Sequence, residues 1–232
     1  MILAEKPMAP KGRETISITT KIYSQIRDDI ISGALKPGDK LKVEILRDNY
    51  EAGASPIREA LSMLTTEGFV DRMEQRGFRV ASVSISAFDE LLKTRCWLEE
   101  KAIRESIQHG DEAWEERVVL SHHRLKQTPR IKTGDGGADW ETTHKRFHMT
   151  LISACGSQFL FDFCSQLYDL NIRYRNIAGQ TAYPARDISS EHLHIFEAVI
   201  ARNADQAVSL LTAHYQGTGG YLKTALQSTG SA

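Results

Sequence analysis

The sequence has few cysteines and no long hydrophobic run. Its three cysteines, Cys96, Cys155 and Cys164, lie far apart and form no C-x-x-C pair, which argues against a disulfide framework and against a thiolate metal site. The N-terminal stretch lacks the apolar core of a signal peptide, and no later stretch approaches the ~18 apolar residues that a membrane span needs. We therefore expect a cytoplasmic protein with no membrane contact.

An excess of positive charge is also absent. The formal net charge of the 232 residues is −1, and 25% of the residues are charged, so the overall composition marks neither a general nucleic-acid coat nor a membrane-surface protein. Any contact with DNA must come from a local basic patch. The length of the chain favours two modest domains, because domains most often have about 100 to 150 residues.

The first part of the chain has the pattern of an arm followed by three helices. Residues 1–15 mix Pro, Lys, Gly and Arg without apolar periodicity and are expected to form a flexible arm. Apolar residues at helical spacing then predict three helices, over residues 20–32, 42–50 and 55–67. Ser55 and Pro56 open the third helix, with Ser55 as the cap of its free N–H groups and Pro56 at the first helical position.

Two short apolar segments follow, residues 69–70 and 78–81, with a polar turn around Arg76 and Gly77 between them. This pattern predicts a two-stranded hairpin. In a winged helix-turn-helix, three helices are followed by such a hairpin, which is called the wing. Residues 16–83 are therefore expected to form a DNA-binding domain.

The remaining residues, 84–228, have helical periodicity almost throughout and little strand signal. Ser86 and Asp89 resemble a capping box at the start of the first helix. Six helices are predicted, over residues 86–109, 111–128, 138–155, 157–178, 188–203 and 205–226. The aromatic residues interpreted as core are Trp97, Trp114, Phe159, Phe163 and Tyr168. We expect a mainly α protein in which an N-terminal winged helix-turn-helix precedes a C-terminal all-helical antiparallel bundle.

The start of the third predicted helix is the candidate DNA contact. In a helix-turn-helix, the second helix of the motif presents its N-terminal side chains to base edges in the major groove. Ser55 and Arg58 occupy this position. An arginine can contact a guanine through two hydrogen bonds or bind a phosphate, which makes Arg58 the leading candidate. A solvated surface charge is the alternative role for Arg58.

Four motifs lie in this region: Gly33-x-Leu35-x-Pro37-Gly38-x-x-Leu41, Ser55-Pro56-Ile57-Arg58-Glu59-Ala60-Leu61, Glu67-Gly68-Phe69-Val70 and Arg76-Gly77-Phe78-x-Val80. Together they closely resemble the winged helix-turn-helix of GntR-family regulators. The resemblance implies that Ser55 and Arg58 face operator DNA and that Arg76 and Gly77 approach the minor groove. Ala54 stands where the family usually has an arginine. Because one such head has a small contact area, we expect a homodimer on a near-palindromic operator.

The helical part of the chain contains the candidate metal ligands. His144 and His148 lie four residues apart and project from one face of a helix, a spacing that lets two imidazoles share one ion. A solvated or coincidental pair is the alternative. His192 and His214 fall on two later helices that a short connection would pack together.

Further motifs in residues 86–226 are Arg95-x-x-Leu98-Glu99, Phe147-His148-x-x-Leu151 and Glu191-His192-x-x-Ile195-x-x-Ala198, with His214 near the end. They look like the FCD ligand-binding domain of the FadR-type branch of GntR regulators. This resemblance implies that His144, His148, His192 and His214 hold a divalent metal. His144 stands where the family usually has Asp, and such an imidazole-rich site favours Zn or Ni over Mn or Mg. Glu141 could restore a carboxylate ligand or be an ordinary exposed residue.

The same resemblance implies an organic-acid effector in the core of the bundle, near the metal. Arg95 occupies a position from which its side chain can approach that pocket. A guanidinium and a cation that face one cavity would suit a small carboxylate effector. The alternative is a structural pair of Arg95 with Glu99, four residues further along the helix.

Three functions are consistent with these patterns. An effector-responsive DNA-binding transcription regulator, expected to be a repressor, accounts for both halves of the chain. A metal-dependent hydrolase is the second, but the chain has no H-E-x-x-H motif and no acid or base between His144 and His148. A zinc-stabilised structural module with a vestigial DNA head is the third, and the intact pattern of residues 33–80 argues against it. We therefore expect a regulator and not an enzyme.

Overall fold

The computed structural model describes residues 17–130, 136–178 and 186–229. The expected flexible arm, residues 1–15, lies outside the described residues. The elements of the N-terminal part are α1 (Ile18–Ser32), β1 (Lys40–Leu41), α2 (Val43–Asn49), α3 (Ala54–Thr66), β2 (Val70–Met73) and β3 (Gly77–Val80). Those of the C-terminal part are α4 (Ile85–His109), α5 (Glu112–Gln127), α6 (Gly136–Leu151), α7 (Gln158–Ala178), α8 (Ile188–Ile200) and α9 (Ala204–Thr229).

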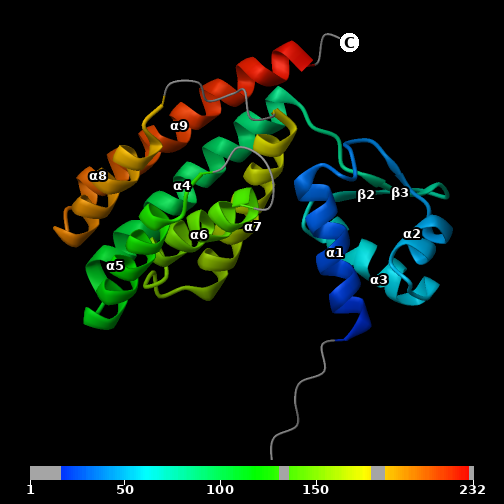
Figure 1. Ribbon diagram of the computed structural model, residues 1–232, viewed down its shortest axis with the longest axis horizontal. Helices are drawn as coiled ribbons and strands as arrows, with labels where there is room; N and C mark the ends of the chain where they lie inside the picture. The colour runs from blue at the N-terminus through cyan, green and yellow to red at the C-terminus, as the bar shows by residue number, and fades with distance from the viewer. Residues whose placement is uncertain (1–16, 131–135, 179–185, 230–232) are drawn as a thin grey trace, which may run out of the picture.

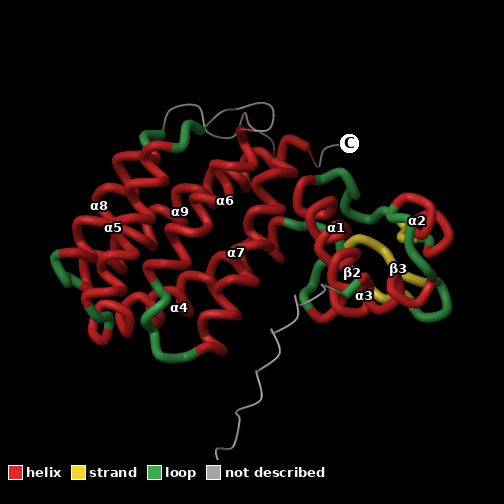
Figure 2. Tube along the Cα trace, turned by 60° about the horizontal axis from the view of Figure 1, so that its bottom comes forward, coloured by secondary structure: helices red, strands yellow, loops and turns green. Residues whose placement is uncertain are grey.

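The two parts of the fold predicted from sequence are confirmed. Figure 1 shows a small lobe of α1, α2, α3 and the strands beside a larger bundle of α4 to α9. Figure 2 shows strands only in the small lobe, while the bundle consists of helices and connecting loops. No helix within the described ranges is both long and apolar enough to cross a membrane.

The small lobe is built on α1 and α3. Ile22, Ile26 and Ile30 recur every four residues along α1 and are buried against the apolar face of α3. The hydroxyl of Ser17 caps the first turn of α1 by accepting a bond from the backbone N–H of Thr20. Burial of this apolar stripe fixes α3, and with it the side chains that the helix presents to solvent.

The start of α3 differs from the prediction. The helix begins at Ala54 with Gly53 in the cap position and no side-chain cap, so Ser55 is not the cap but a residue of the first turn. Pro56 is the third helical residue, two positions further in than expected, and it is tolerated there because the first four N–H groups of a helix have no intrahelical partner. Ser55 therefore lies on the exposed surface at the start of the helix.

The wing contains a third strand that the sequence did not predict. In the described sheet the strand order is β1-β3-β2 with both pairs antiparallel, so β3 is central. Lys40 lies opposite Arg79, and Leu41 lies opposite Phe78. A strand of only two residues is too short for an alternating hydrophobic pattern to be recognised.

The six predicted helices of the bundle are confirmed, with one correction at the start. Ser84, and not Ser86, caps α4, because its hydroxyl accepts a bond from the backbone N–H of Ala87. The long helix α4 packs against α7 and α9, while α5 contacts α6 and α8, and α8 contacts α9. These contacts bring faces of α6, α8 and α9 toward one another.

The helix α7 joins the bundle to the small lobe. Its Asp169 is buried and pairs with Arg27 of α1 and with Lys145 of α6, whose Nζ lies 2.7 and 2.6 Å from the two carboxylate oxygens. Gln166 of α7 donates to the backbone oxygen of Glu67 at 3.1 Å, and Arg173 donates to that of Ala81. The small lobe is therefore fixed to α7 by polar contacts of α7 side chains.

Candidate functional site

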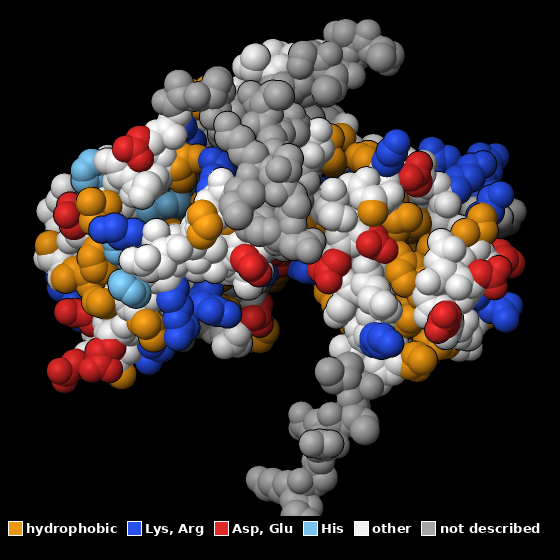
Figure 3. All heavy atoms as spheres, viewed as in Figure 1, with side chains coloured by type: hydrophobic (Ala, Val, Ile, Leu, Met, Phe, Trp, Pro, Cys, Tyr) orange, Lys and Arg blue, Asp and Glu red, His pale blue; other side chains and the backbone are white. Residues whose placement is uncertain are grey.

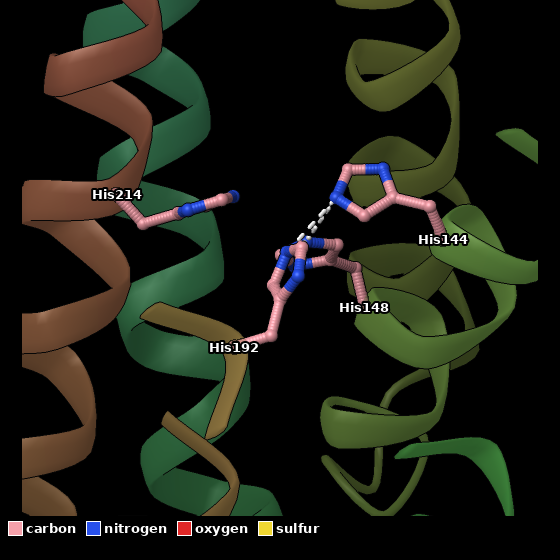
Figure 4. A group of neighbouring side chains, drawn as sticks. All are labelled: His144, His148, His192 and His214. Atoms are coloured by element: carbon pink, nitrogen blue, oxygen red, sulfur yellow. Dashed lines mark hydrogen bonds between the residues drawn. The ribbon is translucent and has the colours of Figure 1, made fainter. Parts of the chain in front are cut away.

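Four histidines from three helices meet in the core of the bundle. His144 and His148 lie one turn apart on α6, His192 lies near the start of α8 and His214 lies on α9. All four are buried, and each offers a ring nitrogen within 4.8 Å of those of the others. Figure 4 shows the four rings pointing toward a common centre. We call these residues the four-histidine cluster.

The spacing within the cluster could accommodate a metal ion. The Nε2 atom of His144 lies 3.0 Å from the Nε2 atoms of both His148 and His192, and the latter two are 3.3 Å apart. Tetrahedral zinc with Zn–N distances of about 2.0 to 2.1 Å places its ligand nitrogens about 3.3 Å from one another. The spacing of these three nitrogens therefore fits a divalent ion, and the structure brings all four histidines named from the sequence within 4.8 Å of one another.

The position of His214 is set by residues outside the cluster. Its Nδ1 atom lies 2.7 Å from Oε2 of Glu191. Arg186 donates to both carboxylate oxygens of Glu191 and to the backbone oxygen of His214, the latter at 2.8 Å. A Cβ at Gly217 would lie 2.8 Å from Nη2 of Arg186, so glycine leaves the space that the guanidinium occupies. The role of Glu191 cannot be recognised from the sequence, because it depends on a contact between α8 and α9.

Burial keeps the cluster uncharged in the metal-free protein. Desolvation lowers the pKa of His192 to about 2 and lowers the pKa values of His144 and His148 well below the usual 6.5. Burial also lowers the pKa of His214, although its hydrogen bond to Glu191 opposes the shift. Neutral imidazole is the form of histidine that binds metals.

Arg95 lies beside the cluster on α4 and is only 3% exposed. Its Nε donates to Oε1 of Glu99 at 2.6 Å, so the pair that the sequence left as an alternative is present. The guanidinium lies over the rings of Tyr215 and Tyr168, 3.8 and 4.7 Å from their centres. Its Nη2 is buried and has no hydrogen-bond partner among the described residues.

Two further sequence interpretations are decided by the structure. Glu141 is not part of the cluster, because its carboxylate pairs with Arg175. The aromatic residues expected in the core divide: Trp114 and Tyr168 are buried, but Trp97, Phe159 and Phe163 are 60%, 82% and 57% exposed. Apolar periodicity does not distinguish a core face from an exposed apolar face.

The residues predicted to contact DNA lie at the surface of the small lobe. Ser55 and Arg58 are exposed at the start of α3, Arg76 is exposed in the turn between β2 and β3, and Gly77 is exposed at the start of β3. Gly77 has a φ of 85°, a backbone conformation that favours glycine. Figure 3 shows Lys and Arg side chains gathered at the outer end of the small lobe, where this turn lies. Because the net charge of the chain is −1, contact with DNA requires a local basic patch, and such a patch is present at this end of the lobe.

The lowered pKa values predict acid sensitivity of the metal-free protein. Below a pH of about 6.5, the usual pKa of histidine, the unfolded chain takes up protons that the four-histidine cluster does not. Lowering the pH from about 7.5 to about 5.5 therefore favours unfolding, by up to about 1.4 kcal/mol per pH unit for each histidine. Scanning calorimetry in chelator checks this. His123→Ala, which removes an exposed histidine, should leave the slope unchanged, and a pH-independent melting temperature would contradict the account.

The chain matches two protein-family models and several described relatives. The model of bacterial regulatory proteins of the gntR family matches residues 18–80, and the FCD domain model matches residues 90–217. The chain is 36% identical to the HTH-type transcriptional regulator BphR of Paraburkholderia xenovorans over 87% of this chain and 84% of the relative. It is 31% identical to the HTH-type transcriptional repressor GlaR of Escherichia coli over 83% and 90%.

Solved structures share the same architecture. The structure of Escherichia coli McbR/YncC superposes with a TM-score of 0.75 at 18% identity and covers 90% of this chain and 99% of that one. A putative transcriptional regulator GntR from Rhodococcus has a TM-score of 0.70 at 19% identity and covers 92% and 98%. At such identities the likeness shows the fold alone. With the two domain matches and the sequence relatives, the chain belongs to the GntR family of bacterial regulators, as a DNA-binding transcription regulator with an FCD domain and not an enzyme.

Proposed function

We propose that the protein represses transcription as a homodimer on a near-palindromic operator and that a small carboxylate effector, bound near a divalent metal, controls its DNA affinity. The observation that carries the proposal is the buried four-histidine cluster beside Arg95, in a bundle fixed to the DNA-binding lobe. The relatives with described roles include one named as a transcriptional repressor. A regulator of this kind needs access to both its operator DNA and its small-molecule effector, so we place it in the cytoplasm.

The donor set favours zinc or nickel as the ion. All four candidate ligands are imidazoles, and the carboxylate of Glu141 pairs with Arg175 instead of joining the cluster. Imidazole suits Zn and Ni, whereas Mg and Mn prefer oxygen ligands. Bound there, the ion would link α6, α8 and α9 and supply positive charge for an anionic effector.

Arg95 supports a carboxylate effector. Its Nε and its charge are matched by Glu99, but its buried Nη2 is left without a partner among the described residues. A buried polar N–H group without an acceptor is unfavourable by about 1 to 3 kcal/mol. An effector carboxylate that accepts from Nη2 would remove this penalty, and the charge-assisted bond would favour acids over neutral analogues.

The route from effector to DNA runs through α7. The hydroxyl of Tyr168 lies 2.6 Å from Nδ1 of His144, and the next residue, Asp169, pairs with Arg27 of the DNA-binding lobe. Lys145, which follows His144 on α6, pairs with the same carboxylate. A ligand that shifts α6 or α7 would therefore act directly on the contact that holds α1, and so on the placement of α3.

Exposed aromatic residues support the homodimer. Trp97 lies on α4, and Phe159 and Phe163 lie four residues apart on α7, the helix that packs against α4. Large exposed aromatic side chains are unusual on a monomer and enriched in interfaces between subunits. Two DNA-binding lobes related by a two-fold axis would read half-sites in successive turns of the major groove.

A zinc-stabilised structural module is the second candidate for the C-terminal domain. The observation that favours it is the number of protein ligands, because four ligands complete a tetrahedral zinc site and leave no open position. In that case, the metal would raise stability without changing the DNA affinity.

The DNA contact is tested by Arg58→Ala. Loss of a contact to a base or phosphate should weaken binding to a DNA fragment from the protein's own promoter by about 10- to 100-fold, while thermal stability stays unchanged because Arg58 is exposed. Fluorescence anisotropy of labelled DNA measures the affinity. Arg117→Ala, an exposed arginine of α5, is the matched control. Equal affinities of both variants and the wild type would remove Arg58 from the interface.

The metal site is tested by His148→Ala and His214→Ala. Each should lower the zinc bound per chain and the melting temperature of the zinc-loaded protein, because metal binding stabilises the folded state by about 2.7 kcal/mol at a hundred times its dissociation constant. Elemental analysis and thermal denaturation measure the two quantities. His123→Ala should retain both. Identical behaviour of the three variants would refute the assignment of the ligands.

A further inference from the structure

A chain of buried hydrogen bonds leads from α4 to the four-histidine cluster. Arg95 donates to Oε1 of Glu99, the hydroxyl of Tyr215 donates to Oε2 of the same carboxylate, and the Tyr215 oxygen lies 3.0 Å from Nδ1 of His148. All four residues are nearly inaccessible, with exposed fractions of 3%, 1%, 3% and 1% in the order of this chain. The arrangement places a tyrosine between a carboxylate and a candidate metal ligand.

We propose that Tyr215 is a positioning residue that fixes His148 in the Nδ1–H tautomer, so that its Nε2 lone pair points into the four-histidine cluster before any ion binds. Glu99 and Arg95 act through Tyr215 by orienting its hydroxyl. The role in metal binding rests on the proposed function, whereas the tautomer follows from the hydrogen bonds alone.

The direction of each bond follows from counting protons. Glu99 is ion-paired with Arg95, and a carboxylate only accepts hydrogen bonds. The single hydroxyl proton of Tyr215 therefore goes to Glu99, and its oxygen can only accept from Nδ1–H of His148. A neutral imidazole carries one N–H, so Nε2 of His148 is left with a free lone pair.

The other histidines are constrained to different degrees. His214 faces the carboxylate of Glu191 through Nδ1, so it is also held as the Nδ1–H tautomer. His144 faces the hydroxyl of Tyr168, which can either donate or accept and does not select a tautomer. Because His148 carries its proton on Nδ1, its Nε2 is the acceptor in the 3.0 Å contact with Nε2 of His144 in the metal-free protein. The donor in this contact is Nε2–H of His144. Ion binding at Nε2 therefore requires the proton of His144 to leave that atom, whereas the proton of His148 stays on Nδ1.

Tyr215→Phe isolates the proposed role. Phenylalanine keeps the ring that lies against Arg95, 3.8 Å from ring centre to guanidinium carbon, and removes only the hydroxyl. Nδ1–H of His148 then loses its acceptor, and the tautomer is no longer fixed. Residues that orient a metal ligand in this way change metal affinity by about 10- to 100-fold when replaced.

The experiment combines nuclear magnetic resonance with zinc titration of the full-length protein. Long-range ¹H–¹⁵N spectra of the metal-free wild type should identify His148 as the Nδ1–H tautomer, and Tyr215→Phe should lose this signature. Competition with a chromogenic chelator should show zinc affinity about 10- to 100-fold lower in Tyr215→Phe. Tyr174→Phe is the matched control, because Tyr174 is a buried tyrosine whose hydroxyl bonds to the backbone at Ser84, away from the cluster.

Two results would overturn the proposal: an Nε2–H tautomer of His148 in the wild type, or zinc affinity in Tyr215→Phe equal to that of Tyr174→Phe. A wild type that binds no zinc but shows the Nδ1–H tautomer would refute the metal site of the proposed function while confirming the tautomer assignment. The spectra therefore distinguish failure of the inference from failure of the metal proposal.

Discussion

The burial of four neutral imidazoles in one helical core is the constraint on which the C-terminal domain depends. Buried polar groups must be hydrogen-bonded or bound to a ligand, because an unsatisfied group lowers stability by about 1 to 3 kcal/mol. For three of the histidines, the outer nitrogen is satisfied by Tyr168, Tyr215 or Glu191. The inner nitrogens of His144, His148 and His192 face one another at distances that suit either shared protons or one ion. Both arrangements require α6 and α8 to keep the same spacing.

Much of this arrangement could be predicted from sequence, because it depends on local periodicity. The spacing of Ile22, Ile26 and Ile30 predicts α1, and the i, i+4 spacing of His144 and His148 predicts two ligands on one face. The outer hydrogen-bond partners could not be found in this way, because Tyr215 and Glu191 reach the cluster through contacts between helices. Short elements also escaped detection, since the two residues of β1 show no alternation.

Exposure was the least predictable property. Trp97 and Phe159 fit a core pattern in the sequence, yet both are exposed. Periodicity identifies the apolar face of a helix but not what covers it, which depends on how neighbouring helices and other subunits pack. The start of α3 was also mispredicted from sequence. A serine before a proline is a good signal for a helix cap, but the extended backbone at Gly53 already begins α3.

The proposed function requires that a conformational change at the four-histidine cluster also changes the placement of the DNA-binding lobe. The helix α7 is the physical link, because it contacts both His144 and Arg27. The most direct test is the operator affinity of chelated and zinc-loaded protein, measured with a panel of small organic acids. We predict that one class of acid changes the affinity by about 5- to 150-fold, the usual range of coupling between two sites, and does so only in the zinc-loaded protein. An affinity independent of metal and of every acid would contradict effector control and would leave a structural metal site.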